Sequence, residues 1–244
     1  MIICNDFIGF ETANQTISFT GGDEESLFLE NLKTQPNDWF YKDLEISYTF
    51  NNNGHRCKNI EDIDLDNYLL FTGCSHTEGV GLRLEDTFPY KVSKALNCDY
   101  YNLAMGGTGI DVLEYNLVTW LSKIKKKPKH IIVQWPDHSR FSALFPGYEN
   151  LLQSGTWSDD PNTLRFIASA EESGFFQARK MVSYSMIQNM VDIPILDVQF
   201  ASLEIWSNAC VWLKRIDLAR DLCHSGIKSH EDITEKILKH ISIR

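Results

Sequence analysis

Short apolar runs, separated by segments of helical periodicity, restrict this chain to a small set of folds. The runs lie at Tyr68–Thr72 (YLLFT), Tyr100–Leu103 (YYNL), Ile131–Trp135 (IIVQW) and Ile195–Val198 (ILDV), and between them apolar residues recur every three or four positions. This alternation predicts an α/β fold built on a doubly wound parallel sheet with right-handed crossovers. Ligands of such sheets bind beyond the carboxyl ends of the strands. The residues that follow each strand are therefore the candidate site residues.

Helix boundaries follow from capping signals and from apolar spacing. We expect helices near residues 87–96, 110–125 and 177–191. The segment Ser229–Asp232 (SHED) has the form of a capping box, which predicts that the last helix begins there.

Two stretches lie outside this alternation. Residues 1–65 are polar and irregular, and we expect them to form an N-terminal extension packed on a main α/β domain of residues 66–244. Residues of about 141–176 fit no regular crossover and contain several turn signals, so they are predicted to be an insertion over the strand ends. A lid, a specificity wall and an inert surface excursion all remain open for this insertion.

Charge and composition limit the partners. The 33 acidic and 23 basic residues give a net charge of −10, which argues against nucleic acid and favours a small or neutral substrate. No uncharged apolar run approaches the ~18–20 residues of a membrane span, and the first residues lack the basic segment of a secretory signal. The six cysteines are scattered, so we expect reduced thiols and a cytoplasmic location. These patterns do not specify the oligomeric state.

A serine and a histidine stand at two of the predicted strand or helix ends. In the segment Gly73–Gly79 (GCSHTEG), Ser75 follows a strand in a glycine-flanked turn, where its hydroxyl can project into the crevice. Asp221 lies three residues before His224 in a loop near the last helix. A carboxylate at this spacing can accept the Nδ1–H of the imidazole and leave Nε2 as a base. Each pattern taken alone is weak, because such serines are commonly helix caps.

Three segments in order resemble the blocks of the SGNH (GDSL-type) hydrolase family. Gly73–Gly79 resembles the first block, Asn102–Gly107 (NLAMGG) the second, and Asp221–His224 (DLCH) the last. The resemblance implies a three-layer α/β sandwich with a flavodoxin-like parallel sheet. It also implies a triad of Ser75, His224 and Asp221, with the N–H groups of Ser75 and Gly107 in the oxyanion hole. Cys74 replaces the aspartate that the family has before its serine.

The family's third block is altered in this chain. After Ile131–Trp135, Asp137 stands where the resemblance implies an asparagine that donates to the oxyanion. Loss of one such donor costs about 10²–10³ in rate, and a carboxylate about 4 Å from the oxyanion adds roughly 4 kcal/mol of repulsion. We therefore expect Asp137 to turn away or to pair with Arg140, while His138 or Ser139 donates instead; protonation of Asp137 is the less favoured alternative. Arg140 is also a candidate substrate-binding cation or a structural anchor.

Other roles for the neighbouring side chains are weaker hypotheses. His76 is next to Ser75, but a neighbouring side chain in such a turn diverges from it. Cys74 is an intrinsically better nucleophile whose surroundings do not favour it. Cys74, His76, Cys223 and His224 could converge on a metal, yet their spacing matches no zinc motif, so no metal is expected.

The favoured function is a serine-dependent hydrolysis of esters, of the esterase or acetylesterase type. The resemblance implies a small-molecule or glycan ester as substrate, with no metal or organic cofactor. Two alternatives remain: a binding or structural module of the same fold with weakened chemistry, and an acyltransferase that uses the same triad.

Overall fold

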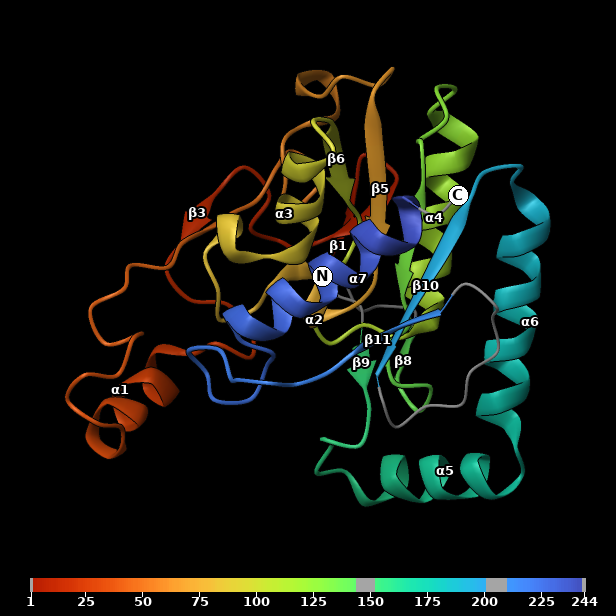
Figure 1. The fold of residues 1–244 in the computed structure, drawn as a ribbon. Coiled ribbons are helices and arrows are strands. Elements are labelled where there is room, and N and C mark those ends of the chain that lie inside the picture. The colour runs from red at the N-terminus through yellow and green to blue at the C-terminus, as the bar shows by residue number, and fades with distance from the viewer. Residues whose placement is uncertain (1, 144–151, 201–209, 243–244) are drawn as a thin grey trace.

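A parallel five-stranded sheet forms the centre of the protein (Figure 1). The computed structural model describes residues 2–143, 152–200 and 210–242. In chain order the strands are β5 (Tyr68–Thr72), β6 (Asp99–Asn102), β7 (Ile131–Gln134), β10 (Ile195–Phe200) and β11 (Cys210–Leu213). Their order across the sheet is β6-β5-β7-β10-β11, and every neighbouring pair is parallel. This is the flavodoxin-like order, in which the direction of winding reverses between β5 and β7. The predicted fold class is confirmed.

Helices cover both faces of the sheet and make it the middle of three layers. On one face lie α4 (Ile110–Lys123) and α6 (Phe175–Met190), and on the other lie α3 (Phe88–Ala95) and α7 (Ile227–Ser242). Each helix presents an apolar stripe to strands that are buried on both sides, as parallel strands require.

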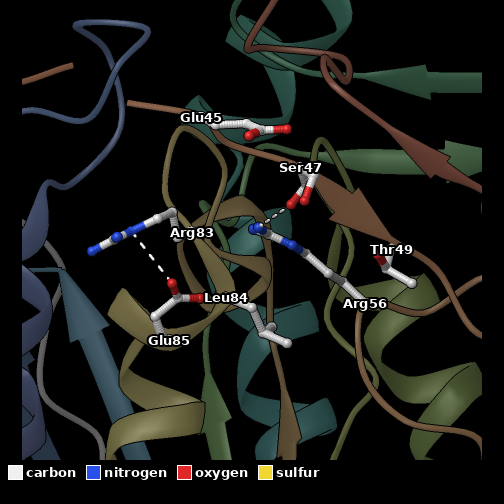
Figure 2. A pocket seen from close by; sticks show the side chains of 7 residues that line it. All are labelled: Glu45, Ser47, Thr49, Arg56, Arg83, Leu84 and Glu85. Atoms are coloured by element: carbon white, nitrogen blue, oxygen red, sulfur yellow. Dashed lines mark hydrogen bonds and ion pairs between the residues drawn. The ribbon is translucent and has the colours of Figure 1, made fainter. Parts of the chain in front are cut away.

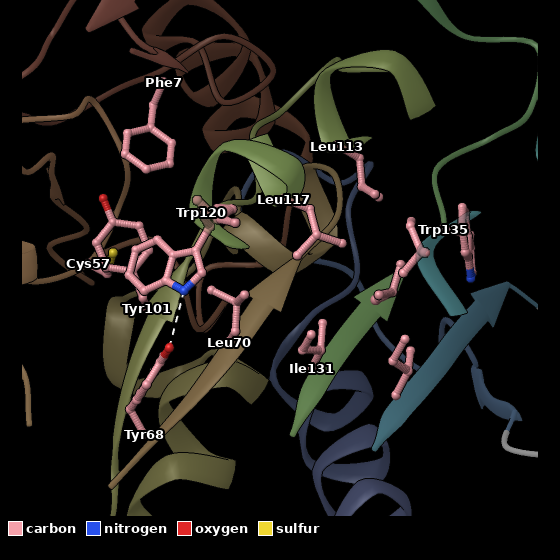
Figure 3. Packing of buried hydrophobic residues seen from close by; sticks show 14 of the residues in the cluster. Phe7, Cys57, Tyr68, Leu70, Tyr101, Leu113, Leu117, Trp120, Ile131 and Trp135 are labelled. Carbon is pink, nitrogen blue, oxygen red and sulfur yellow. Dashed lines mark hydrogen bonds between the residues drawn. The ribbon is translucent and has the colours of Figure 1, made fainter. Parts of the chain in front are cut away.

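A large core cluster lies between the sheet and α4 (Figure 3). Trp120 of α4 is fully buried there, stacks near Tyr101 with ring centroids 4.3 Å apart, and donates its indole N–H to the Tyr68 hydroxyl at 3.2 Å. Buried aromatic side chains with their polar atoms satisfied in this way contribute large apolar area without an unpaired group. They hold β5, the strand that leads to Ser75, rigidly in place.

Short elements make up the N-terminal residues. Strand β1 (Ile2–Cys4) pairs with β2 (Phe7–Gly9), and β3 (Thr16–Ile17) pairs with β4 (Tyr48–Thr49). Helix α1 (Glu25–Thr34) lies between β3 and β4 in the chain, and the 3₁₀ turn η1 (Ile60–Asp62) precedes β5. Apolar side chains of residues 41–50 form a small cluster together with Leu82 and Ala219 of the later chain.

The region predicted as an insertion contains a hairpin and a helix. Strand β8 (Phe141–Ala143) pairs antiparallel with β9 (Leu152–Ser154), and α5 (Pro161–Glu172) follows. Asp160 caps α5 by accepting the N–H of Thr163 at 2.8 Å. Residues 144–151, which also belong to this predicted insertion, lie outside the described residues.

The last helix begins earlier than its sequence pattern predicts. Helix α7 begins at Ile227, and Ser229 lies inside its first turn. The cap comes from Asp217, whose carboxylate accepts the N–H groups of Lys228 and Ser229 at 3.0 and 2.9 Å. The predicted capping box is therefore wrong, because a carboxylate twelve residues upstream of Ser229 satisfies the same donors.

No helix in the described ranges has both the length and the apolar character that crossing a membrane requires.

Candidate active site

Ser75 occupies the sharp turn between β5 and the short helix α2 (Ser75–Glu78), of which it is the first residue. The turn needs glycine at position 73, since a Cβ there would lie 2.5 Å from the Thr77 Oγ1 and 2.9 Å from the Gln134 carbonyl oxygen. Gly79 ends α2 in the left-handed region, with φ of 85°. Ser75 is 4% exposed, so its hydroxyl faces a largely desolvated environment.

His224 and Asp221 meet Ser75 at this turn. The His224 Nε2 lies 2.8 Å from the Ser75 Oγ, and the Nδ1 on the opposite side of the ring contacts the Asp221 carboxylate. The side chain of Asp221 is fully buried, whereas that of His224 is 16% exposed. With Nδ1 donating to the carboxylate, Nε2 carries the lone pair and can accept the proton of the Ser75 hydroxyl. The structure thus brings together the three side chains that the sequence analysis singled out.

The backbone of the Asp221–His224 turn fixes the carboxylate. One oxygen of Asp221 accepts the N–H groups of Cys223 and His224 at 3.1 and 3.0 Å, and the other faces the imidazole. Leu222 adopts a positive φ of 55° within this tight turn. The carboxylate is therefore held by its own local turn and needs no further side chain to aim it.

Residues from the N-terminal part border the imidazole, which the sequence analysis did not foresee. Asp23 and Arg220 form an ion pair at 2.6 Å, with side chains that are 1% and 4% exposed. Tyr48 donates its hydroxyl to Asp23 and accepts the N–H of Gly81 at 2.8 Å. Gly22 lies so close that a Cβ there would be 3.3 Å from the Cε1 of His224. No local sequence signal marks these contacts, and the ion pair joins positions 197 residues apart.

Two backbone N–H groups are available near the serine. Within the described residues, no carbonyl or side chain accepts a hydrogen bond from the N–H of Ser75 or of Gly107. Gly107 has a left-handed φ of 75°, which favours glycine. The preceding Gly106 lies against the nucleophile, since a Cβ on it would be 3.6 Å from the Ser75 Cβ.

The carboxylate of Asp137, in the altered third block, is hydrogen-bonded within its own turn. Asp137 is exposed and accepts both the N–H and the hydroxyl of Ser139, at 2.9 and 2.5 Å, rather than pairing with Arg140. Burial of part of this carboxyl acts to raise its pKa, but the Ser139 hydrogen bonds and the nearby charges of His138 and Arg140 outweigh it and hold the pKa below its usual value. Asp137 is therefore ionised at neutral pH.

The two residues expected to donate in place of Asp137 also have other partners. His138 pairs through Nε2 with Glu171 of α5 at 2.8 Å, and the donors of Ser139 face Asp137. The guanidinium of Arg140 lies 4.9 Å from the ring centroid of Trp157, a half-exposed residue of the insertion. None of these three side chains makes a hydrogen bond to Ser75 in the described part of the chain.

His76 and Cys74 are engaged behind the nucleophile. His76 is 5% exposed, accepts the N–H of Ser225 at 3.4 Å, and has a pKa well below its usual value because burial disfavours the imidazolium, an effect that the neighbouring His224 reinforces. Cys74 donates both its N–H and its thiol to the Gln134 side-chain oxygen, at 3.2 and 3.0 Å. Both residues support the turn.

Among the described residues, the metal-ligating side chains that come together are those of Asp221, Cys223 and His224, whose ligand atoms lie within 4.8 Å of one another. This set differs from the one that the sequence analysis considered, since Cys74 and His76 do not belong to it. The Asp221 oxygens already accept two backbone N–H groups and face the imidazole. A metal there would compete with the contact that orients His224.

Arg56 lines a cavity of about 470 Å³ together with residues of the 45–49 and 83–85 segments (Figure 2). Its guanidinium donates to the carbonyl groups of Gly79 and Leu82 at 2.6 and 2.7 Å. Burial lowers the pKa of Arg56, although the neighbouring Tyr48 and Glu78 oppose that effect. We interpret Arg56 as a support for the turn that follows Ser75.

Comparison with known proteins gives fold neighbours only. No protein-family model matches the chain, and no curated protein sequence matches it. Among solved structures, it is similar to the acetyl xylan esterase Est2A from the rumen bacterium Butyrivibrio proteoclasticus, with 15% identity and a TM-score of 0.43 over 72% of this chain. The match spans 63% of that esterase.

Further structural neighbours are also carbohydrate esterases and GDSL-family lipolytic proteins. A family 2 carbohydrate esterase from Corynascus thermopiles (Myceliophthora fergusii) matches at 11% identity and a TM-score of 0.47, covering 72% of this chain and 66% of that one. A member of the lipolytic G-D-S-L family from Veillonella parvula matches at 11% identity and a TM-score of 0.39, covering 70% and 96%. At such identities these matches assign no role to any residue of this chain.

Proposed function

We propose that this protein is a serine-dependent ester hydrolase in which Ser75 is the nucleophile, His224 the general base and Asp221 the residue that orients the imidazole. The observation that supports it most is the pair of contacts made by His224. Its Nε2 lies 2.8 Å from the Ser75 Oγ while its Nδ1 faces the fully buried Asp221 carboxylate. This is the distance and order of contacts that a hydroxyl needs to be activated by an imidazole.

The reaction divides into two halves that use the same groups. In the first, the Ser75 oxygen attacks the ester carbonyl carbon and its proton passes to the Nε2 of His224; the alcohol then leaves with that proton, and the acyl group stays on Ser75. In the second, water gives a proton to His224 and attacks the acyl carbon, and the acid leaves as Ser75 recovers its proton. The N–H groups of Ser75 and Gly107 stabilise both tetrahedral oxyanions.

The proposed substrate class rests on the charge of the chain and on one exposed aromatic residue. The net charge of −10 favours a small or glycan ester over an anionic polymer. Trp157 is 49% exposed and stacks with Arg140, a pair that resembles a platform for a sugar ring or for the edge of an acyl group. We therefore propose esters of short acyl groups, acetylated sugars among them, with Arg140 and Trp157 at the substrate side.

Turnover of p-nitrophenyl acetate tests the proposal. The wild-type protein should hydrolyse it, and Ser75→Ala should lose that activity. Ser225→Ala is a matched control, since this serine is adjacent to His224 and its hydroxyl has no hydrogen-bond partner in the described residues. A serine-reactive phosphonate should label the peptide that carries Ser75 and no other. Equal rates for wild type and Ser75→Ala would refute the proposal.

One observation favours a second candidate, a binding module with weakened chemistry. The side chains of His138 and Ser139 are engaged with Glu171 and Asp137, so neither supplies the third oxyanion donor. A site with two backbone donors in place of three would lose about 10²–10³ in rate. Tight binding of an acetylated glycan, combined with Ser75-independent background hydrolysis, would support this candidate.

A further inference from the structure

Two side chains hold the backbone of Gly106 from opposite sides. Its N–H donates to the Glu78 Oε2 at 2.5 Å, and its carbonyl oxygen accepts the Gln153 side-chain N–H at 3.0 Å. The residue lies directly against the proposed nucleophile, and a Cβ on it would come 3.0 Å from the Glu78 Oε2. The backbone at this point is therefore fixed by specific hydrogen bonds and by close packing.

The contact with Gln153 determines the direction of a neighbouring N–H. The carbonyl of Gly106 and the N–H of Gly107 belong to the same planar trans peptide unit, so they point in opposite directions. A donor on the carbonyl fixes the orientation of that N–H and also polarises it, which strengthens any hydrogen bond that it donates. Because the Gln153 amide donates to the Gly106 carbonyl oxygen, the N–H of Gly107 in the same peptide unit is directed away from Gln153.

The burial of the Glu78 carboxyl costs free energy, which indicates a role other than stabilising the fold. It is 1% exposed, and burial raises its pKa to about 7 even though Arg56, the N–H of Gly106 and His224 act to lower it. Its Oε1 has no hydrogen-bond partner among the described residues. A buried oxygen without a partner costs free energy, which calls for a compensating role.

The folding of two separate segments delivers these side chains to Gly106. Glu78 lies three residues after Ser75 on α2, which places both on adjacent positions of one helical face. Gln153 belongs to β9, and its partner strand β8 is attached to α4 through the N–H of Ser142, which donates to the Asp111 carboxylate at 2.5 Å. The predicted insertion thus contributes a residue at the second oxyanion donor.

We propose that Glu78 and Gln153, together the Gly106 clamp, are positioning residues that hold the Gly106–Gly107 peptide with the N–H of Gly107 directed at the oxyanion. This second proposal rests on the proposed ester hydrolysis and adds detail to it. It acts on the transition state, because the negative charge that Gly107 stabilises develops only there. Its loss should therefore reduce kcat while KM stays close to the wild-type value.

Substitutions at both ends of the clamp test this with p-nitrophenyl acetate. Gln153→Met keeps the side-chain length without the donor and should lower kcat about 10–100-fold, part of the loss expected for a whole oxyanion donor. Gln153→Glu should be worse, since a carboxylate repels the Gly106 carbonyl. Glu78→Ala should resemble Gln153→Met, and the conservative Glu78→Gln should recover part of the loss. Gln177→Met, which removes one side-chain hydrogen bond on α6, is the control.

A second readout separates positioning from general damage. A boronic acid forms a tetrahedral adduct on an active serine, so its inhibition constant should rise across the variants by the same factor as kcat/KM falls. Thermal unfolding identifies any variant that fails to fold. In that case the other variant at the same position, Gln153→Glu or Glu78→Gln, tests the proposal.

The outcomes are distinct. If Ser75→Ala retains wild-type turnover, the hydrolase proposal fails and the clamp fails with it. If turnover requires Ser75 but kcat of Gln153→Met and of Glu78→Ala stays within about twofold of wild type, the clamp alone is refuted. A rise in KM with unchanged kcat would also refute it, because that pattern indicates lost substrate binding.

Discussion

Replacing Asp221 by asparagine gives the sharpest test of how the imidazole is oriented. Asparagine keeps an oxygen that can accept the N–H groups of Cys223 and His224, which the carboxylate accepts at 3.1 and 3.0 Å, so the turn itself should persist. Its NH₂ group, however, then faces the Nδ1 of His224. That nitrogen must accept rather than donate, and the ring proton moves to Nε2. The Nε2 lies 2.8 Å from the Ser75 Oγ and can no longer take its proton.

The size of the effect follows from this change of tautomer. Holding the wrong tautomer in a serine triad lowers kcat by about 10⁴, which corresponds to roughly 5 kcal/mol of transition-state stabilisation. That factor includes the loss of charge, because the side chain of Asp221 is fully buried and stabilises the imidazolium that forms during attack. A charge pair about 4 Å apart is worth about 4 kcal/mol at an effective dielectric near 20.

The assay is kcat for ester hydrolysis, measured beside the thermal unfolding of each variant. Asp217→Asn is the matched control, since it makes the same change of charge four residues earlier, at the cap of α7. We expect kcat to fall about 10⁴-fold in Asp221→Asn and to stay close to wild type in the control. If Asp221→Asn keeps kcat within about tenfold while Ser75→Ala is inactive, the assignment of Asp221 as the orienting residue is refuted.

Two further predictions concern stability. Burial lowers the pKa of His55 to about 4 and of His230 to about 3, so both rings are neutral in the folded protein. In the unfolded chain these two histidines bind protons below about pH 6.5, whereas in the folded protein they stay neutral. The free energy of unfolding should therefore fall between pH 6.5 and 4, by about 3 kcal/mol for His55. Urea titrations should show a smaller fall for His55→Gln; an equal fall would contradict this. Arg220→Met leaves Asp23 buried without its ion-pair partner and should cost about 3–5 kcal/mol; a loss below about 1 kcal/mol would contradict that prediction.

The sheet could be predicted because its strands are buried on both faces and therefore appear as uninterrupted apolar runs. The runs that became β5, β6, β7 and β10 were all identified. The edge strand β11 was not, because its four residues (CVWL) form a short run with no turn signal to separate a strand from part of a helix. The start of α7 was misplaced for a related reason. Local capping signals compete with a cap supplied from a distant loop, here by Asp217.

The sequence predicts those residues of the candidate site that lie in short motifs, which follow one another along the chain in a recognisable order. Ser75, Gly107, Asp221 and His224 could be selected because each stands in a short pattern with a chemical reason behind it. The groups that hold these residues could not be selected. Glu78 reaches Gly106 across 28 positions and Gln153 reaches it across 47, and neither contact has a local signature. Supporting residues act through tertiary contacts, which a single sequence does not encode at any fixed spacing.

The N-terminal residues show that supports for the candidate site can come from a segment in which the sequence analysis marked no site residue. Residues 1–65 follow no regular strand–helix alternation, and the sequence alone predicts only an N-terminal extension packed on the main domain. Yet Asp23 fixes Arg220, the residue next to Asp221, and Gly22 leaves only enough room for the edge of the His224 ring. Asn31 adds a hydrogen bond to the Arg220 carbonyl at 3.2 Å. An ion pair and backbone hydrogen bonds thus let the N-terminal residues set the position of the turn that carries the proposed general base.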